Sequence, residues 1–246
     1  MRWALSAVML GACSSGAGSA PAPSTLHDAQ APDVAAAHRA SDALRRCAGA
    51  AGALGSIAEA VTRLNALPAP ADGPCFVATL PRPLSVVATT GIFSAQPAAG
   101  AASPRLFFLL PKLVVSAVPA GDGSKVLEFG EWITPTRTAK GEVALPVATP
   151  LLPDAPFTRV DRGNGRSACG MCHRGEEPHP SIAHAFVSAA FKPDRGTEVP
   201  LGELRKAHDA CIRDADPSDR CAMFHAVFDF GEVVAGAYAD DVETFN

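Results

Sequence analysis

Seven cysteines constrain the fold of this 246-residue chain more than any other feature, because their spacing divides them into three groups. Cys13 lies near the N-terminus, and only two residues separate Cys169 from Cys172. The other four are Cys47, Cys75, Cys211 and Cys221. An even number of remaining cysteines in an exported protein predicts disulfides. The pairing Cys47–Cys75 with Cys211–Cys221 closes the shortest loops, so we expect these two bonds, each stabilising the fold by about 2–4 kcal/mol.

The close pair belongs to the pentapeptide Cys169-Gly170-Met171-Cys172-His173. This is the C-x-x-C-H pattern of covalent haem attachment. Two thiols at this spacing can add to the two vinyl groups of one porphyrin, and the adjacent imidazole can ligate the iron. The pentapeptide resembles the attachment motif of c-type cytochromes, and the resemblance covers these five residues. It implies one covalent haem c, with Cys169 and Cys172 as attachment points and His173 as the proximal ligand.

Two other interpretations of the motif stay open. Cys169 and Cys172 can form a disulfide, which leaves His173 as an ordinary polar neighbour. A structural zinc site is the second alternative, because cysteine and histidine are the usual ligands of such sites. Its further ligands would come from His173, His179, Cys211 and Cys221.

The N-terminus indicates export. Residues 1–12 have a positive start and a short apolar run, Ala4–Leu10, which is too short to span a bilayer and is typical of a signal peptide. Leu10-Gly11-Ala12-Cys13 resembles the lipobox of bacterial lipoproteins, and the resemblance implies that Cys13 is acylated and starts the mature protein. Cleavage after Ala12 as an ordinary secretory signal is the alternative. Residues 13–32, rich in Ser, Gly, Ala and Pro, predict a flexible tether. We therefore expect a lipid-anchored protein of the cell envelope, at the outer membrane or the periplasmic face.

The first half of the mature chain changes from helical to strand-like patterning. Residues 33–74 are expected to be helical, since apolar residues recur there at helical spacing. Residues 75–160 contain short runs rich in Val, Leu, Phe and Thr between turn residues, which predicts antiparallel strands in a β-sandwich-like module without catalytic residues. The runs are Phe76–Leu80, Leu84–Thr90, Arg105–Val118 (divided by Pro111), Lys125–Trp132 and Glu142–Val147.

Residues 161–246 are expected to form a helical, cytochrome c-like region that carries the motif. We predict helices from Ser181 to about Lys192, over 201–213 and over 216–230. Several prolines before the motif exclude the helix that soluble cytochromes c place there. The predicted fold class is therefore α+β.

A cytochrome that transfers electrons usually has a second axial ligand, Met or His. Met171 lies inside the attachment loop, so Met223 is the Met candidate of the mature chain. His208 is the main alternative, because it interrupts an apolar helical stripe. Both residues have an ordinary explanation as buried side chains, and an open distal position is a further alternative. Weaker candidates are His179, His184 and His225.

Charge and motifs exclude several functions. The net charge is −4 and no basic cluster occurs, so nucleic-acid binding is not expected. The sequence contains no nucleophile-elbow, Walker or zinc-protease motif. We favour an electron-transfer lipoprotein that exchanges electrons with a redox partner protein through one haem c. The alternatives are a non-redox binding or structural lipoprotein held by disulfides, and a haem enzyme with an open distal position.

Overall fold

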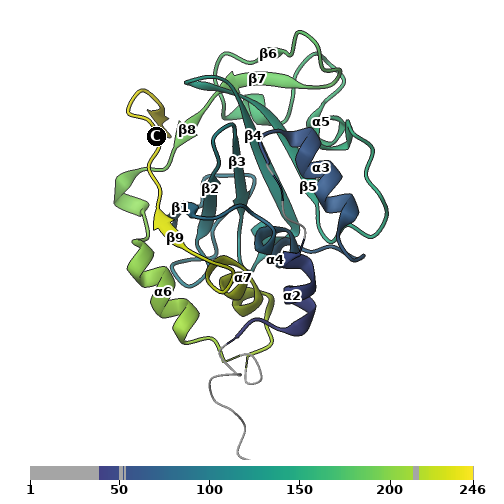
Figure 1. Ribbon diagram of the computed structural model, residues 1–246. Helices are drawn as coiled ribbons and strands as arrows, with labels where there is room; N and C mark the ends of the chain where they lie inside the picture. Colours follow the sequence, from purple (N-terminus) through teal and green to yellow (C-terminus); the bar gives the residue numbers. More distant parts are fainter. Residues whose placement is uncertain (1–38, 50–51, 53, 213–215, 246) are drawn as a thin grey trace, which may run out of the picture. The chain divides into compact units, whose positions relative to one another are not determined.

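The computed structural model describes residues 39–246 apart from positions 50–51, 53, 213–215 and 246 (Figure 1). The predicted signal peptide, Cys13 and the tether lie outside the described residues. The described residues belong to one compact unit. None of the described helices is long and apolar enough to cross a membrane.

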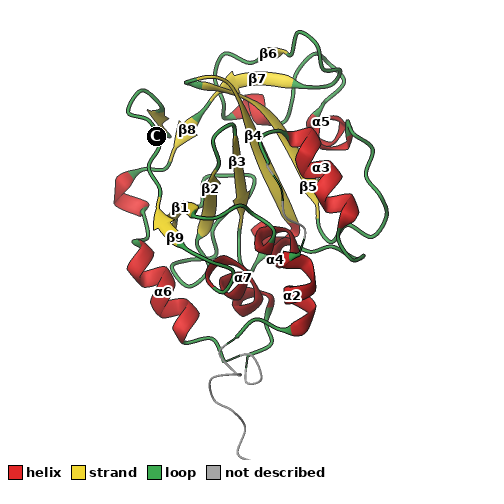
Figure 2. Ribbon diagram, viewed as in Figure 1, coloured by secondary structure: helices red, strands yellow, loops and turns green. Residues whose placement is uncertain are grey.

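The unit is built on a sheet of eight strands in the order β6-β7-β5-β4-β3-β2-β1-β9 (Figure 2). Neighbouring strands are antiparallel except β1 and β9, which are parallel. A separate pair joins β8 to β10. The strand bounds are β1 Leu84–Thr89, β2 Arg105–Leu109, β3 Leu113–Ala117, β4 Val126–Thr134, β5 Arg137–Ala144, β6 Glu177–Pro178, β7 Phe186–Ala189, β8 Phe191–Lys192, β9 Val233–Ala235 and β10 Glu243–Thr244.

Short helices surround the sheet, and side-chain caps start several of them. Ser41, Ser56, Asp72 and Ser218 each accept a hydrogen bond from the first turn of the helix that follows. The α-helices are α2 Asp42–Ala48, α3 Ile57–Ala66, α4 Gly73–Ala78, α5 Ala155–Val160, α6 Leu201–Asp209 and α7 Asp219–Phe228. The 3₁₀ turns are η1 Asp122–Lys125, η2 Cys169–Met171 and η3 Arg195–Thr197.

The sheet has an apolar and a polar face, because successive side chains of a strand point to opposite sides. The apolar face packs against α2, α3, α4, α6 and α7 in one core, and each fully buried large side chain there contributes about 1.5–3 kcal/mol. Its central side chains are Leu106, Phe108, Leu113, Val115, Leu127 and Phe129. The side chains that alternate with them define the opposite side, which we call the polar face. These include Arg105, Ser116, Glu128 and Lys140.

The predicted β-sandwich is wrong, because helices and not a second sheet cover the apolar face. The run Phe76–Leu80, predicted as a strand, begins inside helix α4. Asp72 accepts a hydrogen bond from the backbone N–H of Cys75 at 2.7 Å, and Pro74 lies in the first turn. An N-cap followed by proline favours a helix start. Helix α4 therefore fills the place that a second sheet would need.

Residues 161–246 are mixed and not helical as predicted. The segment from Ser181 to Lys192, predicted as a helix, contains β7 and β8. Strand β7 pairs with β5, with Ala189 opposite Arg137. This pairing joins residues far apart in the sequence, and local periodicity does not reveal it. Helices α6 and α7 lie within the predicted ranges 201–213 and 216–230 but are shorter.

The strand predictions from Leu84 onward are confirmed in outline. Pro111 lies between β2 and β3, as its missing N–H predicts. Strands β1 and β4 differ from their predicted bounds by one or two residues, and β5 begins five residues before its predicted start.

Candidate functional site

Both predicted disulfides are present, each with an S–S distance of 2.08 Å. One joins α2 to α4, and the other joins the segment after α6 to the first turn of α7. Because Cys211 and Cys221 form a disulfide with each other, the alternative zinc site that uses either of them is wrong. Cys169 and Cys172 are free thiols, so the alternative disulfide between them is not formed.

The C-x-x-C-H pentapeptide forms one tight helical turn. Ala168 and Cys172 have right-handed helical dihedral angles on either side of η2. The carbonyl oxygen of Cys169 accepts hydrogen bonds from the backbone N–H groups of Cys172 at 3.1 Å and His173 at 2.9 Å. Residues three and four apart lie on one side of such a turn. The turn therefore brings both thiols and the imidazole to the same side, as attachment to one porphyrin requires.

The carboxylate of Glu176 stabilises this turn. The Glu176 carboxylate accepts two hydrogen bonds from Ser167, one from its backbone N–H at 2.9 Å and one from its hydroxyl. The same hydroxyl oxygen accepts the N–H of Cys169 at 3.0 Å. A Cβ atom on Gly170 would lie 2.4 Å from the Glu176 carboxylate, so a larger residue there would displace this carboxylate. Glu176 therefore holds the start of the motif in its helical conformation.

The imidazole of His173 is held as a neutral ring with a defined tautomer. Its Nδ1 lies 2.8 Å from the backbone oxygen of Ala189. A carbonyl oxygen can only accept, so Nδ1 carries the proton and Nε2 keeps its lone pair. The ring stacks on Phe191 with centroids 5.2 Å apart. Burial, and then the nearby charge of Lys140, lower the pKa of His173 to about 3, so the ring is neutral at physiological pH.

A small cavity of about 70 Å³ lies between the motif and the polar face. Arg105 lines the cavity and donates hydrogen bonds to Glu128 at 2.6 Å and to Ser116 at 2.7 Å. The other oxygen of Glu128, Oε1, is buried without a partner among the described residues. Further side chains around the cavity are Thr138, Lys140, His173, Phe191 and Tyr238.

Burial shifts the pKa of two groups near the motif, Lys140 and Cys169. It lowers the pKa of Lys140 to about 8, and it raises the pKa of the Cys169 thiol to about 11. Cys169 is therefore a protonated thiol at neutral pH. Near neutral pH the motif and its surroundings therefore hold a neutral His173 imidazole, a protonated Cys169 thiol and a Lys140 ammonium group that loses its proton more easily than usual.

Met223 does not lie near the motif. It is 2% exposed on α7, and its methyl carbon lies 3.2 Å from where a Cβ on Gly73 would be. Met223 belongs to the core on the apolar face, whereas His173 lines the cavity on the polar face. The sheet lies between them, so Met223 packs as a core residue here.

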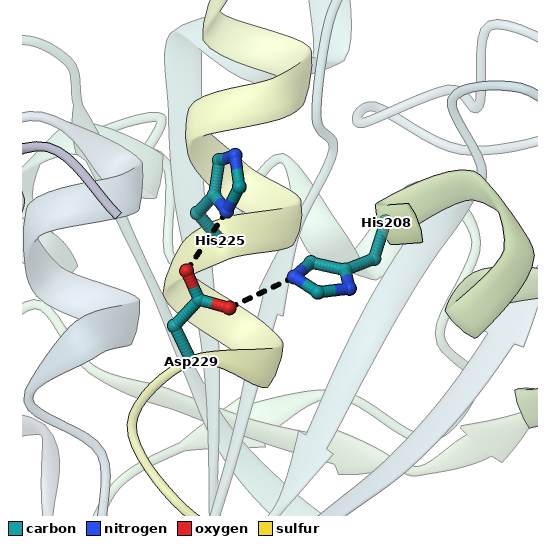
Figure 3. A group of neighbouring side chains, drawn as sticks. All are labelled: His208, His225 and Asp229. Atoms are coloured by element: carbon teal, nitrogen blue, oxygen red, sulfur yellow. Dashed lines mark hydrogen bonds and ion pairs between the residues drawn. The ribbon is translucent and has the colours of Figure 1, made fainter. Parts of the chain in front are cut away.

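His208 also lies apart from the motif, at the contact of α6 with α7. Figure 3 shows its ring and that of His225 on two sides of the Asp229 carboxylate. His208 Nε2 lies 2.8 Å from Oδ1, and His225 Nδ1 lies 2.8 Å from Oδ2. The backbone N–H of Ala40 donates to the same Oδ2 at 2.6 Å. Asp229, which the sequence analysis did not single out, is therefore the centre of a cluster that we call the His–Asp–His cluster.

The weaker distal candidates all have local partners. His179 Nδ1 accepts backbone N–H groups from Ser181 and Ile182, and His184 pairs with Asp161 at 2.7 Å. His225 is 3% exposed inside the His–Asp–His cluster. None of these imidazoles lines the cavity beside His173.

Sequence reasoning missed the charged residues of the polar face. Arg105 and Glu128 lie in runs that were classified by their apolar members, and Lys140 lies just before the predicted run that starts at Glu142. The alternation of Arg105 and Glu128 with buried leucine and phenylalanine could have indicated that the second face is polar and partly covered. No family model, curated protein or solved structure matches this chain. The functional argument therefore rests on these residues.

Proposed function

We propose that this chain is a lipoprotein of the cell envelope that binds one haem c through Cys169 and Cys172 and transfers electrons. The observation that carries the proposal is the turn that presents two reduced thiols and a neutral imidazole on one side. A thioether forms when an S–H group adds across a vinyl double bond: sulfur bonds to one carbon and hydrogen to the other. This addition needs a thiol and no oxidant, so free thiols are the required state.

The donor set of this site suits haem. Histidines that ligate metals usually donate their other ring N–H to a carbonyl or carboxylate, and His173 makes this hydrogen bond to Ala189. Phe191 restricts the rotation of the ring by stacking. His173 thus needs neither deprotonation nor reorientation at Nδ1 to offer Nε2 as a ligand. The cavity is too small to enclose a porphyrin, so the proposal depends on the donor set and not on an enclosed pocket.

When bound, haem supplies the one-electron redox step at its iron. The protein contributes attachment, an axial imidazole and access for a partner. Cys172 is exposed, and Met171 beside it is 73% exposed. A redox partner protein could therefore approach the attachment turn from solvent, as direct electron exchange requires. Neither Met223 nor His208 lies where it could complete the axial set without rearrangement, so we expect neither to determine the iron spectrum.

Ligand binding without haem is a second candidate function, and one observation favours it. An open pocket of about 470 Å³ lies at the ends of the β2–β3 and β4–β5 hairpins, beside the C-terminal segment. Its lining includes Pro111, Trp132, Ile133, Pro135 and Tyr238, and Ile133 is 43% exposed. Apolar and aromatic linings of this kind are common in binding sites.

A haem stain distinguishes the two candidates. The full chain is produced with a cytochrome c maturation system, separated by denaturing electrophoresis and stained for covalent haem. We expect a stained band for the wild type and for Met171→Leu, a matched control that keeps both thiols and His173. The double variant Cys169→Ala, Cys172→Ala should give none. An unstained wild type with both disulfides recovered by non-reducing peptide mapping would overturn the haem proposal in favour of ligand binding.

The anchor is tested separately, since it does not depend on haem. Cys13→Ser should release the protein from the detergent phase into the aqueous phase, because acylation of Cys13 is the proposed attachment to the membrane. Ser14→Ala is the matched control and should remain in the detergent phase. Unchanged partitioning of Cys13→Ser would contradict the lipobox resemblance.

A further inference from the structure

The His–Asp–His cluster is a second group of metal-ligating side chains, separate from the attachment turn. Its members are His208 on α6, His225 on α7 and Asp229 at the end of α7. One ligand atom from each lies within 4.8 Å of the other two. Two imidazoles and one carboxylate form a donor set that binds divalent transition metals.

In the metal-free cluster His208 Nε2 and His225 Nδ1 both donate to the Asp229 carboxylate, so a metal ion must displace the proton from each of these nitrogens. His208 has a second carboxylate, Asp209 Oδ1, 3.0 Å from its Nδ1. A proton at Nδ1 would keep that hydrogen bond while Nε2 turns its lone pair toward Asp229. Carboxylates in this outer position orient metal-ligating histidines and raise their basicity.

The surroundings of His225 permit the change of tautomer that metal binding through Nδ1 requires. The residue is 3% exposed, and its Nε2 is buried without a hydrogen-bond partner among the described residues. A proton that moves from Nδ1 to Nε2 breaks no hydrogen bond at Nε2, but it leaves a buried N–H group without an acceptor, a cost that the bond from Nδ1 to the ion must exceed. Nδ1 then offers its lone pair toward Asp229. An ion between the rings would replace the N–H hydrogen bond that Nδ1 loses.

The scaffold holds these groups in place. The Cys211–Cys221 disulfide joins the segment after α6 to the first turn of α7, so the two helices that carry the histidines cannot separate. Asp229 follows His225 by four residues, which places both on one side of α7. The side chains of His208 and Asp229 are 18% and 15% exposed, so an ion and a water molecule can reach them.

We propose that the His–Asp–His cluster binds one divalent transition metal ion of the zinc class through His208 Nε2, His225 Nδ1 and Asp229, with a position left for water. Zinc bonds of about 2.1 Å at tetrahedral angles separate ligand atoms by about 3.4 Å. The present nitrogen–oxygen distances of 2.8 Å therefore need to open by about 0.6 Å on loading. The ion would tie α6 to α7 and, through the Ala40 N–H on Asp229, to the start of the described chain.

Titration of the full chain in detergent, after treatment with a chelator, tests the proposal. Calorimetry with Zn²⁺ should show one equivalent bound, weakened at least about 100-fold by His208→Gln, because a direct ligand should count for more than an outer-shell group. Asp209→Asn should weaken binding about 10- to 100-fold. Asp209 is 75% exposed, so this variant keeps the test valid if His208→Gln unfolds. His179→Gln, a change in another loop, should bind as the wild type does.

Cobalt separates this site from the free thiols of the attachment turn. Co²⁺ bound to nitrogen and oxygen ligands shows visible d–d bands without strong sulfur-to-metal charge-transfer absorption. We expect that spectrum in the wild type and in Cys169→Ser, Cys172→Ser, and its loss in His208→Gln. Charge-transfer absorption that disappears with the two serines would overturn the proposal. So would unchanged zinc affinity in both His208→Gln and Asp209→Asn, or no binding by the folded wild type.

Discussion

His173 and His208 were both considered as iron ligands, yet their surroundings give them opposite properties. His173 is half-buried near Lys140, and its ring donates a hydrogen bond to a carbonyl oxygen. His208 lies between the carboxylates of Asp209 and Asp229. The pKa of His173 falls to about 3, whereas hydrogen bonds to Asp229 and then to Asp209 raise the pKa of His208 against its partial burial. One imidazole is kept neutral and the other is stabilised as a cation.

The difference shows that the neighbours of a histidine determine its chemistry more than its place in a helical stripe does. A neutral ring with one nitrogen committed to a carbonyl can ligate haem iron without losing a proton. A ring between two carboxylates must give up a proton before it binds a metal. The first belongs to the motif on the polar face, and the second to the cluster between α6 and α7.

The largest expected effect is spectroscopic and separates the two histidines directly. In haem-loaded protein, His173→Ala should change the Soret and visible bands, because it removes the proximal ligand. His208→Ala should leave them unchanged, since this side chain lies on α6, at the contact with α7 and away from the motif. Absorption spectra of both oxidation states measure the effect. A spectrum altered by His208→Ala and not by His173→Ala would reverse the assignment.

Loss of the central carboxylate should have the largest effect on stability. Asp229→Ala removes the partner of His208, His225 and the Ala40 N–H, and leaves buried donors without acceptors. We expect a loss of about 2–4 kcal/mol in the free energy of unfolding, measured by urea denaturation at pH 6 with chelator present. Asp209→Ala, at an exposed position, should cost less than about 1 kcal/mol. An equal loss of unfolding free energy in Asp229→Ala and Asp209→Ala would mean that Asp229 contributes no more than an exposed ion pair does.

Acid should destabilise the haem-free protein through His173. Its folded-state pKa of about 3 lies below the ordinary value of about 6.5, so the unfolded chain binds the proton first. Stability is therefore full above pH 6.5 and falls below it, by up to about 1.4 kcal/mol per pH unit. Urea denaturation between pH 7 and pH 5 should show a smaller decline in His173→Gln than in the wild type. Parallel curves would exclude a buried neutral ring.

Alkali should weaken the His–Asp–His cluster, with the opposite sign. The raised pKa of His208 means that its contribution is complete below about pH 6.5 and is lost as pH rises through the folded-state value. The pKa of Asp229 is lowered, so its carboxylate stays ionised in mild acid and keeps its hydrogen bonds to the histidines there. We expect a change on the order of 1 kcal/mol between pH 6 and pH 9 with chelator present. Lys140, with a pKa of about 8, also titrates in this range. The difference between the wild type and His208→Gln separates the contribution of His208 from that of Lys140.

The smallest spectroscopic effect is expected from Met223, the methionine candidate for the distal ligand. Met223→Leu keeps the volume of a core residue, so the free energy of unfolding should fall by less than about 1.5 kcal/mol. The iron spectrum of haem-loaded protein should not change, because Met223 lies on the other side of the sheet from His173. Loss of a sulfur-dependent absorption band in Met223→Leu would show that the two sides come together when haem is attached.

Local features were predictable from the sequence, and those that depend on long-range pairing were not. The two disulfides close short loops, and Pro111 divides a run by chemistry contained in the residue itself. The attachment motif is likewise local. In contrast, β7 exists because it pairs with β5, and the tautomer of His173 depends on Ala189, a residue of that strand. Met223 and His173 could be separated only once the sheet between them was known.

The hydrogen bond from the Ala40 N–H to Asp229 fixes the N-terminal end of the described chain to the end of α7. Ala40 is the point at which the leading segment joins the folded body, and it docks at the end of α7. The attachment turn lies beside β7, near the opposite edge of the sheet from β1, which α6 contacts. The proposed anchor at Cys13 would therefore connect to the body through Ala40, at the end of α7, and would leave the exposed Cys172 beside β7 accessible to partners.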